Sequence, residues 1–225
     1  MQSVLRALVA AVYVPPNSPV PNPPVATREA LNRIWTEVTS TYPYQSLQFS
    51  PQGDAVQFIG SSPEEGVTIQ PPLVQVQESV LGSLLSAETS ARKAQAILKT
   101  VQEHLGVPFF LNLGIRVISN FTVPSNDGRD FILHRAAVQD EARLGELAGG
   151  GYVWMGLKYV VHQADGSFFT AVVEPLQADP RMLYVDLDAQ FPGMVALDAI
   201  EERTRDSMRY VDRVLDYLKH SGTAG

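Results

Sequence analysis

Residues 152–176 read YVWMGLKYVVHQADGSFFTAVVEPL, two strand-like runs on either side of a short turn sequence. Residues 152–163 and 168–176 are rich in Val, Tyr and Phe, which are common in β-strands. Between them, Ala164-Asp165-Gly166-Ser167 contains the Asp-Gly pair that is typical of tight hairpin turns. This stretch therefore predicts an antiparallel β-hairpin.

The residues around the hairpin predict further strands and two helices. Met182–Ala189 alternates apolar and polar side chains, which is the period-two pattern of a half-buried strand. In Val195–His220, apolar residues recur every three or four positions, as on one face of a helix. Before the hairpin, Phe109–Val123 predicts a strand and Asp127–Gln139 a helix. The second half of the chain is thus expected to run β-α-β-β-β-α.

The first half predicts the same order of elements. They are a strand (Val4–Val14), a helix capped by Thr27 (Thr27–Thr41), a hairpin (Tyr44–Ser50 and Ala55–Gly60), a strand interrupted by two prolines (Val67–Gln77) and a helix that begins at Ser86. Because both halves share this order, the sequence predicts a duplicated β-α-β-β-β-α unit.

The predicted fold class is α+β, with mostly antiparallel sheets and with helices packed on one face. The first unit is expected at residues 1–108 and the second at residues 109–225. Neither half alone is an ideal size for a stable core, so we expect the two units to form one compact body. Residues 15–24 contain six prolines and predict an extended spacer, because proline disfavours helix and favours a polyproline path.

The charge composition of the chain argues against two classes of binding partner, nucleic acids and anionic membranes. The chain carries 17 basic and 24 acidic residues, a net charge of −7, and no run of Lys or Arg. Binding to nucleic acid or to an anionic membrane requires a positive patch, so neither is expected as a partner. No apolar stretch approaches the roughly 20 residues of a transmembrane helix, and the N-terminal residues lack a signal-peptide pattern. The chain is expected to be cytoplasmic.

Several short motifs are similar to those of a known protein family. They are the apolar start Leu8–Val14, the helix end at Tyr42-Pro43, the central Leu113–Asn120 and the acidic strand Tyr184–Asp188. In these motifs, which are spread over most of the chain, the sequence resembles a sporadically distributed bacterial family of unknown function. Val117 stands where that family has an aromatic residue. The resemblance implies the same order of elements and no particular activity.

In element order alone, the chain also resembles gyrase-inhibitor-like effector-binding domains. Those domains duplicate a β-α-β-β unit and bind small molecules in the groove between the halves, with an acidic residue on a central strand. The resemblance implies a comparable place for Glu174. A shared fold does not imply a shared function, so the implied small-molecule groove is an expectation about architecture.

Five residues are candidates for binding a partner or a ligand. In the first strand of the hairpin, alternation puts Tyr152, Trp154 and Lys158 on one face. Glu174 and Arg116 are charged residues inside otherwise apolar strands. Aromatic and basic residues on an open sheet are typical of subunit interfaces, and they can also bind a planar or anionic ligand.

Two carboxylates are candidates for a metal site. Asp186 and Asp188 are two positions apart in a predicted strand, so their side chains point to the same face and could bind a divalent cation. His162 is the histidine best placed to act with them. No phosphate-binding loop and no dinucleotide-binding motif is present, so no cofactor is expected.

Three functions remain open. The favoured hypothesis is a non-catalytic interaction or assembly protein that uses an exposed sheet face to bind itself, as a homodimer, or another protein. The alternative is a small-molecule-binding module with a groove between the halves. The third is a metal-dependent hydrolase that uses Asp186, Asp188 and His162. We rank the enzyme last because no coherent set of catalytic residues is evident in the sequence.

Overall fold

The computed structural model describes residues 3–13, 26–62, 65–70, 72–79, 87–137, 141–149 and 154–220. The predicted proline-rich spacer at residues 15–24 lies outside this part of the chain. In chain order the elements are β1 (Ser3–Tyr13), α1 (Arg28–Thr41), β2 (Ser46–Phe49), β3 (Val56–Ile59), β4 (Gly66–Gln70), β5 (Leu73–Ser79), α2 (Ala87–Leu105), β6 (Phe110–Thr122), α3 (Gly128–Asp130), the π-helical turn η1 (Phe131–Ala136), α4 (Glu141–Ala148), β7 (Leu157–His162), β8 (Phe168–Pro175), β9 (Met182–Val195) and α5 (Ala199–His220).

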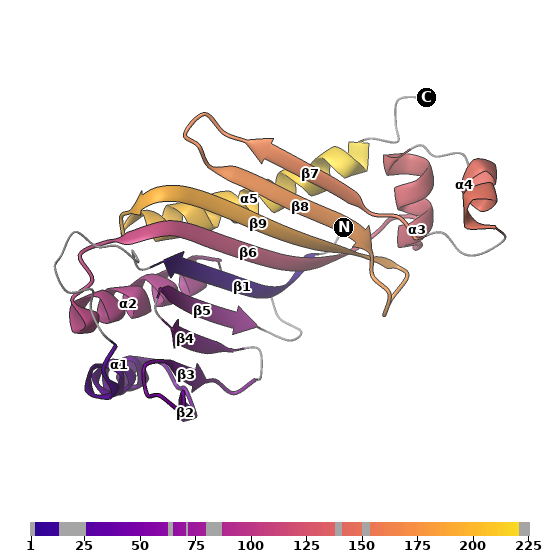
Figure 1. The fold of residues 1–225 in the computed structure, drawn as a ribbon. Coiled ribbons are helices and arrows are strands. Elements are labelled where there is room, and N and C mark those ends of the chain that lie inside the picture. The colour runs from indigo at the N-terminus through magenta and orange to yellow at the C-terminus, as the bar shows by residue number, and fades with distance from the viewer. Residues whose placement is uncertain are drawn as a thin grey trace.

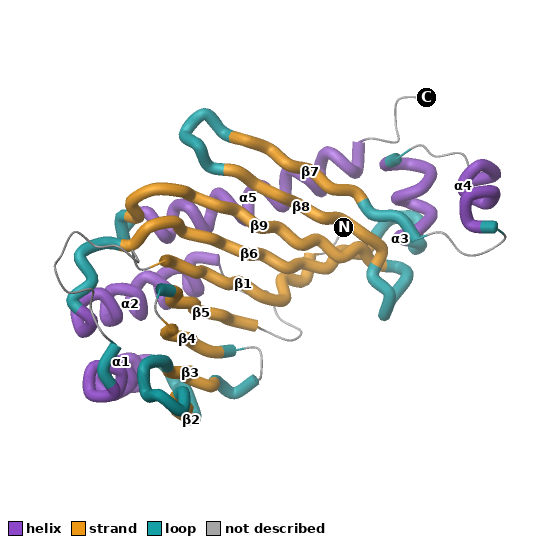
Figure 2. The backbone as a smooth tube through the Cα atoms, in the orientation of Figure 1, coloured by secondary structure: helices purple, strands orange, loops and turns teal. Residues whose placement is uncertain are grey.

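The strands form one nine-stranded sheet in the order β2-β3-β4-β5-β1-β6-β9-β8-β7 (Figure 1). Every neighbouring pair is antiparallel. The residues of the two predicted units meet where β1 pairs with β6, and each half extends outward from there. Figure 2 shows the strands of both halves as one continuous, twisted surface. The α+β fold class predicted from the sequence is therefore confirmed.

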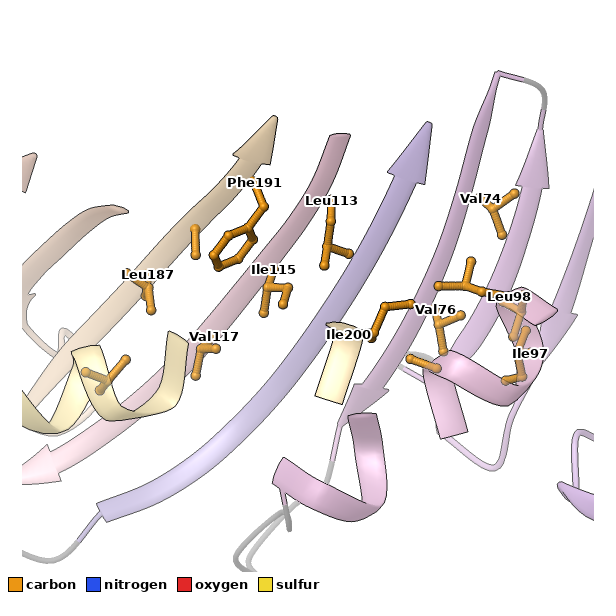
Figure 3. Close-up of a cluster of buried hydrophobic side chains, with 14 of the residues drawn as sticks. Val74, Val76, Ile97, Leu98, Leu113, Ile115, Val117, Leu187, Phe191 and Ile200 are labelled. Carbon is orange, nitrogen blue, oxygen red and sulfur yellow. The ribbon is translucent and has the colours of Figure 1, made fainter. Parts of the chain in front are cut away.

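Helices α1, α2 and α5 cover one face of the sheet (Figure 1). They lie side by side, with α1 packed on α2 and α2 packed on α5. The strand residues that face them include Leu113, Ile115 and Val117 of β6, which are apolar and buried and point into the core (Figure 3). Because side chains alternate along a strand, the polar residues between them are placed on the opposite face.

One predicted strand is in fact two. Val67–Gln77 was expected to be a single interrupted strand, but β4 and β5 form a hairpin in which Gln70 pairs with Leu73. Pro72 lies in the turn, where its fixed φ is favourable and where it has no ladder hydrogen bond to donate. The first half therefore contains one strand more than the predicted unit.

A buried ion cluster joins α2 to the sheet in the first half. The side chain of Lys93 is only 9% exposed, and its Nζ lies 3.1 Å from Glu65 Oε1 and 2.8 Å from Glu78 Oε1. The ammonium group also lies over the ring of Tyr44, 4.9 Å from its centroid. Burial opposes the charge on Lys93, but hydrogen bonding and attraction to Glu78, Glu65 and Tyr44 outweigh it and raise the pKa of Lys93. The sequence predicted no such cluster.

We expect Lys93→Met to lower the free energy of unfolding by about 3–5 kcal/mol, because it leaves two partly buried carboxylates without a counter-charge. Lys99→Met, on the same helix, is the matched control. Its side chain is 66% exposed, and its loss is expected to cost less than about 1 kcal/mol. Urea denaturation measures both values. Equal losses in the two variants would contradict a structural role for the cluster.

Candidate functional site

The face of the sheet opposite the helices is polar at its centre. In β9 the odd-numbered residues from Leu183 to Ala189 are buried, so Tyr184, Asp186 and Asp188 are placed on the open face. No helix of the described residues covers this face in Figure 1. The alternation predicted for this strand from the sequence is confirmed by the burial pattern.

Arg116 and Asp186 form a bidentate ion pair on this open face. Arg116 Nε donates to Asp186 Oδ1 at 2.9 Å, and Arg116 Nη2 donates to Asp186 Oδ2. Tyr184 Oη donates to the same Oδ2 at 3.2 Å. The hydrogen bonds and the negative charge of Asp186 raise the pKa of Arg116, and burial together with that charge raises the pKa of Tyr184. Both donors therefore keep their protons at neutral pH.

The two predicted metal ligands already have partners within the chain. Asp186 accepts from Arg116 and Tyr184, and Asp188 Oδ1 accepts from Gln190 Nε2. His162 lies on β7, beyond β8, with its ring 5.8 Å from that of Phe168. Among the described residues, no group of three His, Cys, Asp or Glu side chains could hold a metal ion. The residues proposed for a hydrolase are thus not assembled into one site.

The predicted partner-binding residues fall into two groups. Lys158 on β7 and Glu174 on β8 lie on the open face, and no ion pair joins them within the described part of the chain. Arg116 is three strands away from Lys158, about 14 Å at the usual spacing between strands. Trp154 precedes β7 and is 37% exposed. Tyr152 lies outside the described residues.

The outer end of the second half exposes an apolar surface that sequence reasoning missed. Helix α5 packs mainly against β6, β9 and β8, and it reaches β7, the last strand of the sheet, through the contact of Tyr217 with Tyr159. Two consecutive residues of β7 are exposed on opposite faces, Val160 at 49% and Val161 at 37%. Two adjacent valines in a strand were the signal in the sequence, because a half-buried edge strand normally places a polar residue on its solvent face.

A groove follows α5 beneath this strand. One part of it, of about 280 Å³, is lined by aromatic rings and one basic residue, and the other part, of about 350 Å³, continues under the β7–β8 turn. Tyr210 and Arg213 line both parts, so the two hollows adjoin along α5. At one end, the rings of Tyr159 and Tyr217 meet edge to face at 6.1 Å. At the other end, Arg203 donates to Asp165 at 3.1 Å.

Comparisons with known proteins identify no family. No family model and no curated protein matches the sequence. Among solved structures, the di-domain ARO/CYC BexL from the BE-7585A biosynthetic pathway is similar over 100% of both chains, with 11% sequence identity and a TM-score of 0.24. A similarity of that size carries no argument about the fold or the function of this chain. Within the described residues, every helix is too short or too polar to cross a membrane.

We expect millimolar Mn²⁺ to leave the Tm of the protein unchanged, because both carboxylates of the Asp186–Asp188 pair are engaged by side-chain donors. Asp186→Asn should lower the free energy of unfolding by up to about 1 kcal/mol through the loss of a partly exposed ion pair. Asp188→Asn serves as the control, because it leaves the Arg116–Asp186 ion pair unchanged. A rise in Tm with Mn²⁺ in the wild type that disappears in Asp186→Asn would instead indicate a metal site.

Proposed function

We propose that the chain is a non-catalytic interaction protein that assembles with a second copy of itself through the edge strand β7. The observation that carries the proposal is that β7 ends the sheet with apolar side chains exposed on both faces, Val160 and Val161. An edge strand presents a row of backbone N–H and C=O groups that can pair with another strand, and soluble proteins usually protect such edges. An exposed apolar edge therefore favours an interface.

The opposite edge of the sheet, β2, has features that protect an edge strand from pairing with another chain, and β7 lacks them. β2 has only four residues, and its exposed side chains, Ser46 and Gln48, are polar. Its other two side chains are partly buried against the core. Short strands with polar outward residues are a common protection of a sheet edge. The contrast between the two edges supports association through β7 and not through β2.

The sequence of β7 is compatible with pairing to a copy of itself. An antiparallel pair centred on Val160 places Lys158 of one copy opposite His162 of the other, and Tyr159 opposite Val161. A pair centred on Tyr159 places Lys158 opposite Val160. Neither arrangement sets the two lysines against each other, and like charges directly opposite are what destabilise such pairs. Trp154 and Glu174 would then lie at the rim of the interface.

The alternative, a small-molecule groove between the two halves, has less support. The halves are joined by the pairing of β1 with β6, and beneath this pair α2 packs directly on α5. The cavities described above lie within the second half. Space for a ligand between the halves would require these packed elements to separate.

Val160→Lys is expected to convert the protein from a dimer to a monomer, because it places a charge on the exposed face of each paired edge strand. Gln48→Lys is the matched control, since it puts the same side chain on an exposed position of the opposite edge and should leave the dimer intact. Light scattering coupled to gel filtration measures the mass, and circular dichroism checks the fold. A monomeric wild type at high micromolar concentration, or a dimer that survives Val160→Lys, would contradict the proposal.

A further inference from the structure

The groove along α5 has a filled counterpart in the first half of the same molecule. There, α1 connects β1 to the outer strands and lies against α2. Its residues Leu31, Ile34 and Val38 are buried, and Trp35 packs edge to face on Phe58 with 5.1 Å between ring centroids. An amphipathic helix is thus the element that completes the helical layer beneath the outer strands of the first half (Figure 1).

In the second half, the equivalent segment lies elsewhere. The segment between β6 and β7 forms α3, η1 and α4, which lie at one end of the sheet (Figure 1). Its start is held there, because Gly128 N donates to Pro180 O at 2.6 Å. A Cβ at Gly128 would lie 2.8 Å from Met182 O, so only glycine allows this close contact. Phe131 and Ile132 are buried in the same region. The position beside α5 that corresponds to α1 is therefore not filled by the described residues.

The groove has the length of the missing helix. Its lining residues on α5 run from Arg203 to Tyr217, which is about 21 Å at 1.5 Å per residue. Helix α1 has 14 residues, which is also about 21 Å. The remaining helix of the second half, α4, has eight residues and is too short to fill it.

Charge indicates what the occupying helix presents to α5. In the first half, Glu37 of α1 meets α2, with His104 Nε2 at 2.7 Å and Thr100 Oγ1 at 3.1 Å. These hydrogen bonds lower the pKa of Glu37, so the helix presents a carboxylate to its neighbour. On α5, Arg213 lines both parts of the groove and forms no ion pair with any residue that the structure describes. Tyr and Arg are also the residue types that dominate binding energy at interfaces.

We infer that the groove on the outer side of α5 binds an amphipathic helix of about four turns from a partner protein. The apolar side of that helix would pack on Tyr159, Val214 and Tyr217, and an acidic residue would pair with Arg213. This interaction is distinct from the pairing of β7, which uses the backbone edge of the strand. The protein would then combine self-association with the capture of a helix.

The test uses the protein's own α1 as the surrogate helix. A fluorescent peptide of residues 26–42 is titrated with the full-length chain and followed by fluorescence anisotropy. We expect saturable binding to the wild type and about tenfold weaker binding to Tyr217→Ala, because Tyr is enriched among the few residues that dominate the binding energy of interfaces. Arg213→Glu should weaken binding several-fold, and a peptide carrying Glu37→Lys should restore it. Tyr217 is 64% exposed and Arg213 is exposed, so both variants should fold.

Lys99→Glu, an exposed substitution on α2, is the matched control and should bind the peptide as the wild type does. The inference is overturned if the peptide does not bind the wild type, or if it binds both α5 variants with unchanged affinity. It is also overturned if Tyr217→Ala dissociates a dimer, since the groove would then belong to the second copy. Peptide binding that persists in monomeric Val160→Lys would show that the groove acts independently of the β7 interface.

Discussion

The pairing of β1 with β6 holds the two halves of the molecule together in one sheet. The ladder runs from Ser3 opposite Phe121 to Tyr13 opposite Leu111, with irregularities near both ends. Because these strands are hydrogen-bonded neighbours, the two halves form one sheet, and α2 and α5 are brought together beneath it. Each remaining strand adds outward from this pair, so the two edges of the sheet belong to different halves.

The two outer ends of the sheet, at β2 and at β7, differ in how they are covered, and this difference is the basis of the proposed function. In the first half, α1 lies against α2, and the outermost strand, β2, is short and has polar exposed side chains. In the second half, the corresponding segment is held at the end of the sheet by the contact at Gly128, so no helix of the described residues lies on the outer side of α5, and Val160 and Val161 of β7 are exposed. The polar centre of the open face is instead internally satisfied, since Arg116, Tyr184 and Asp186 bond to one another. The exposed apolar edge and the groove along α5 are therefore found together at the outer end of the second half.

The hydrophobic and turn patterns of the sequence predicted most helices and strands. The features that they did not predict depend on contacts between residues that are distant in the sequence. The hairpin around Asp165-Gly166 and the alternation in β9 follow from backbone chemistry and are present. The prolines after Gln70 predict an interrupted strand, whereas the structure has a turn there. The sequence does not separate the two, because proline lacks an N–H donor and is compatible with either. The sequence does not mark Lys93 as a buried residue, because its burial depends on Glu65 and Glu78, which are distant in sequence. Likewise, no local signal showed that the partners of Asp186 would come from its own sheet, or that the segment before β7 would leave α5 uncovered.

If the outer end of the second half is the association surface, the amide hydrogen exchange of β7 must depend on protein concentration. Exchange would be followed over a range of protein concentrations, with β7 and β2 compared as the two edges of one sheet. We predict that amides of β7 exchange more slowly as concentration rises, whereas those of β2 do not change. Exchange in β7 that is fast and independent of concentration would contradict it.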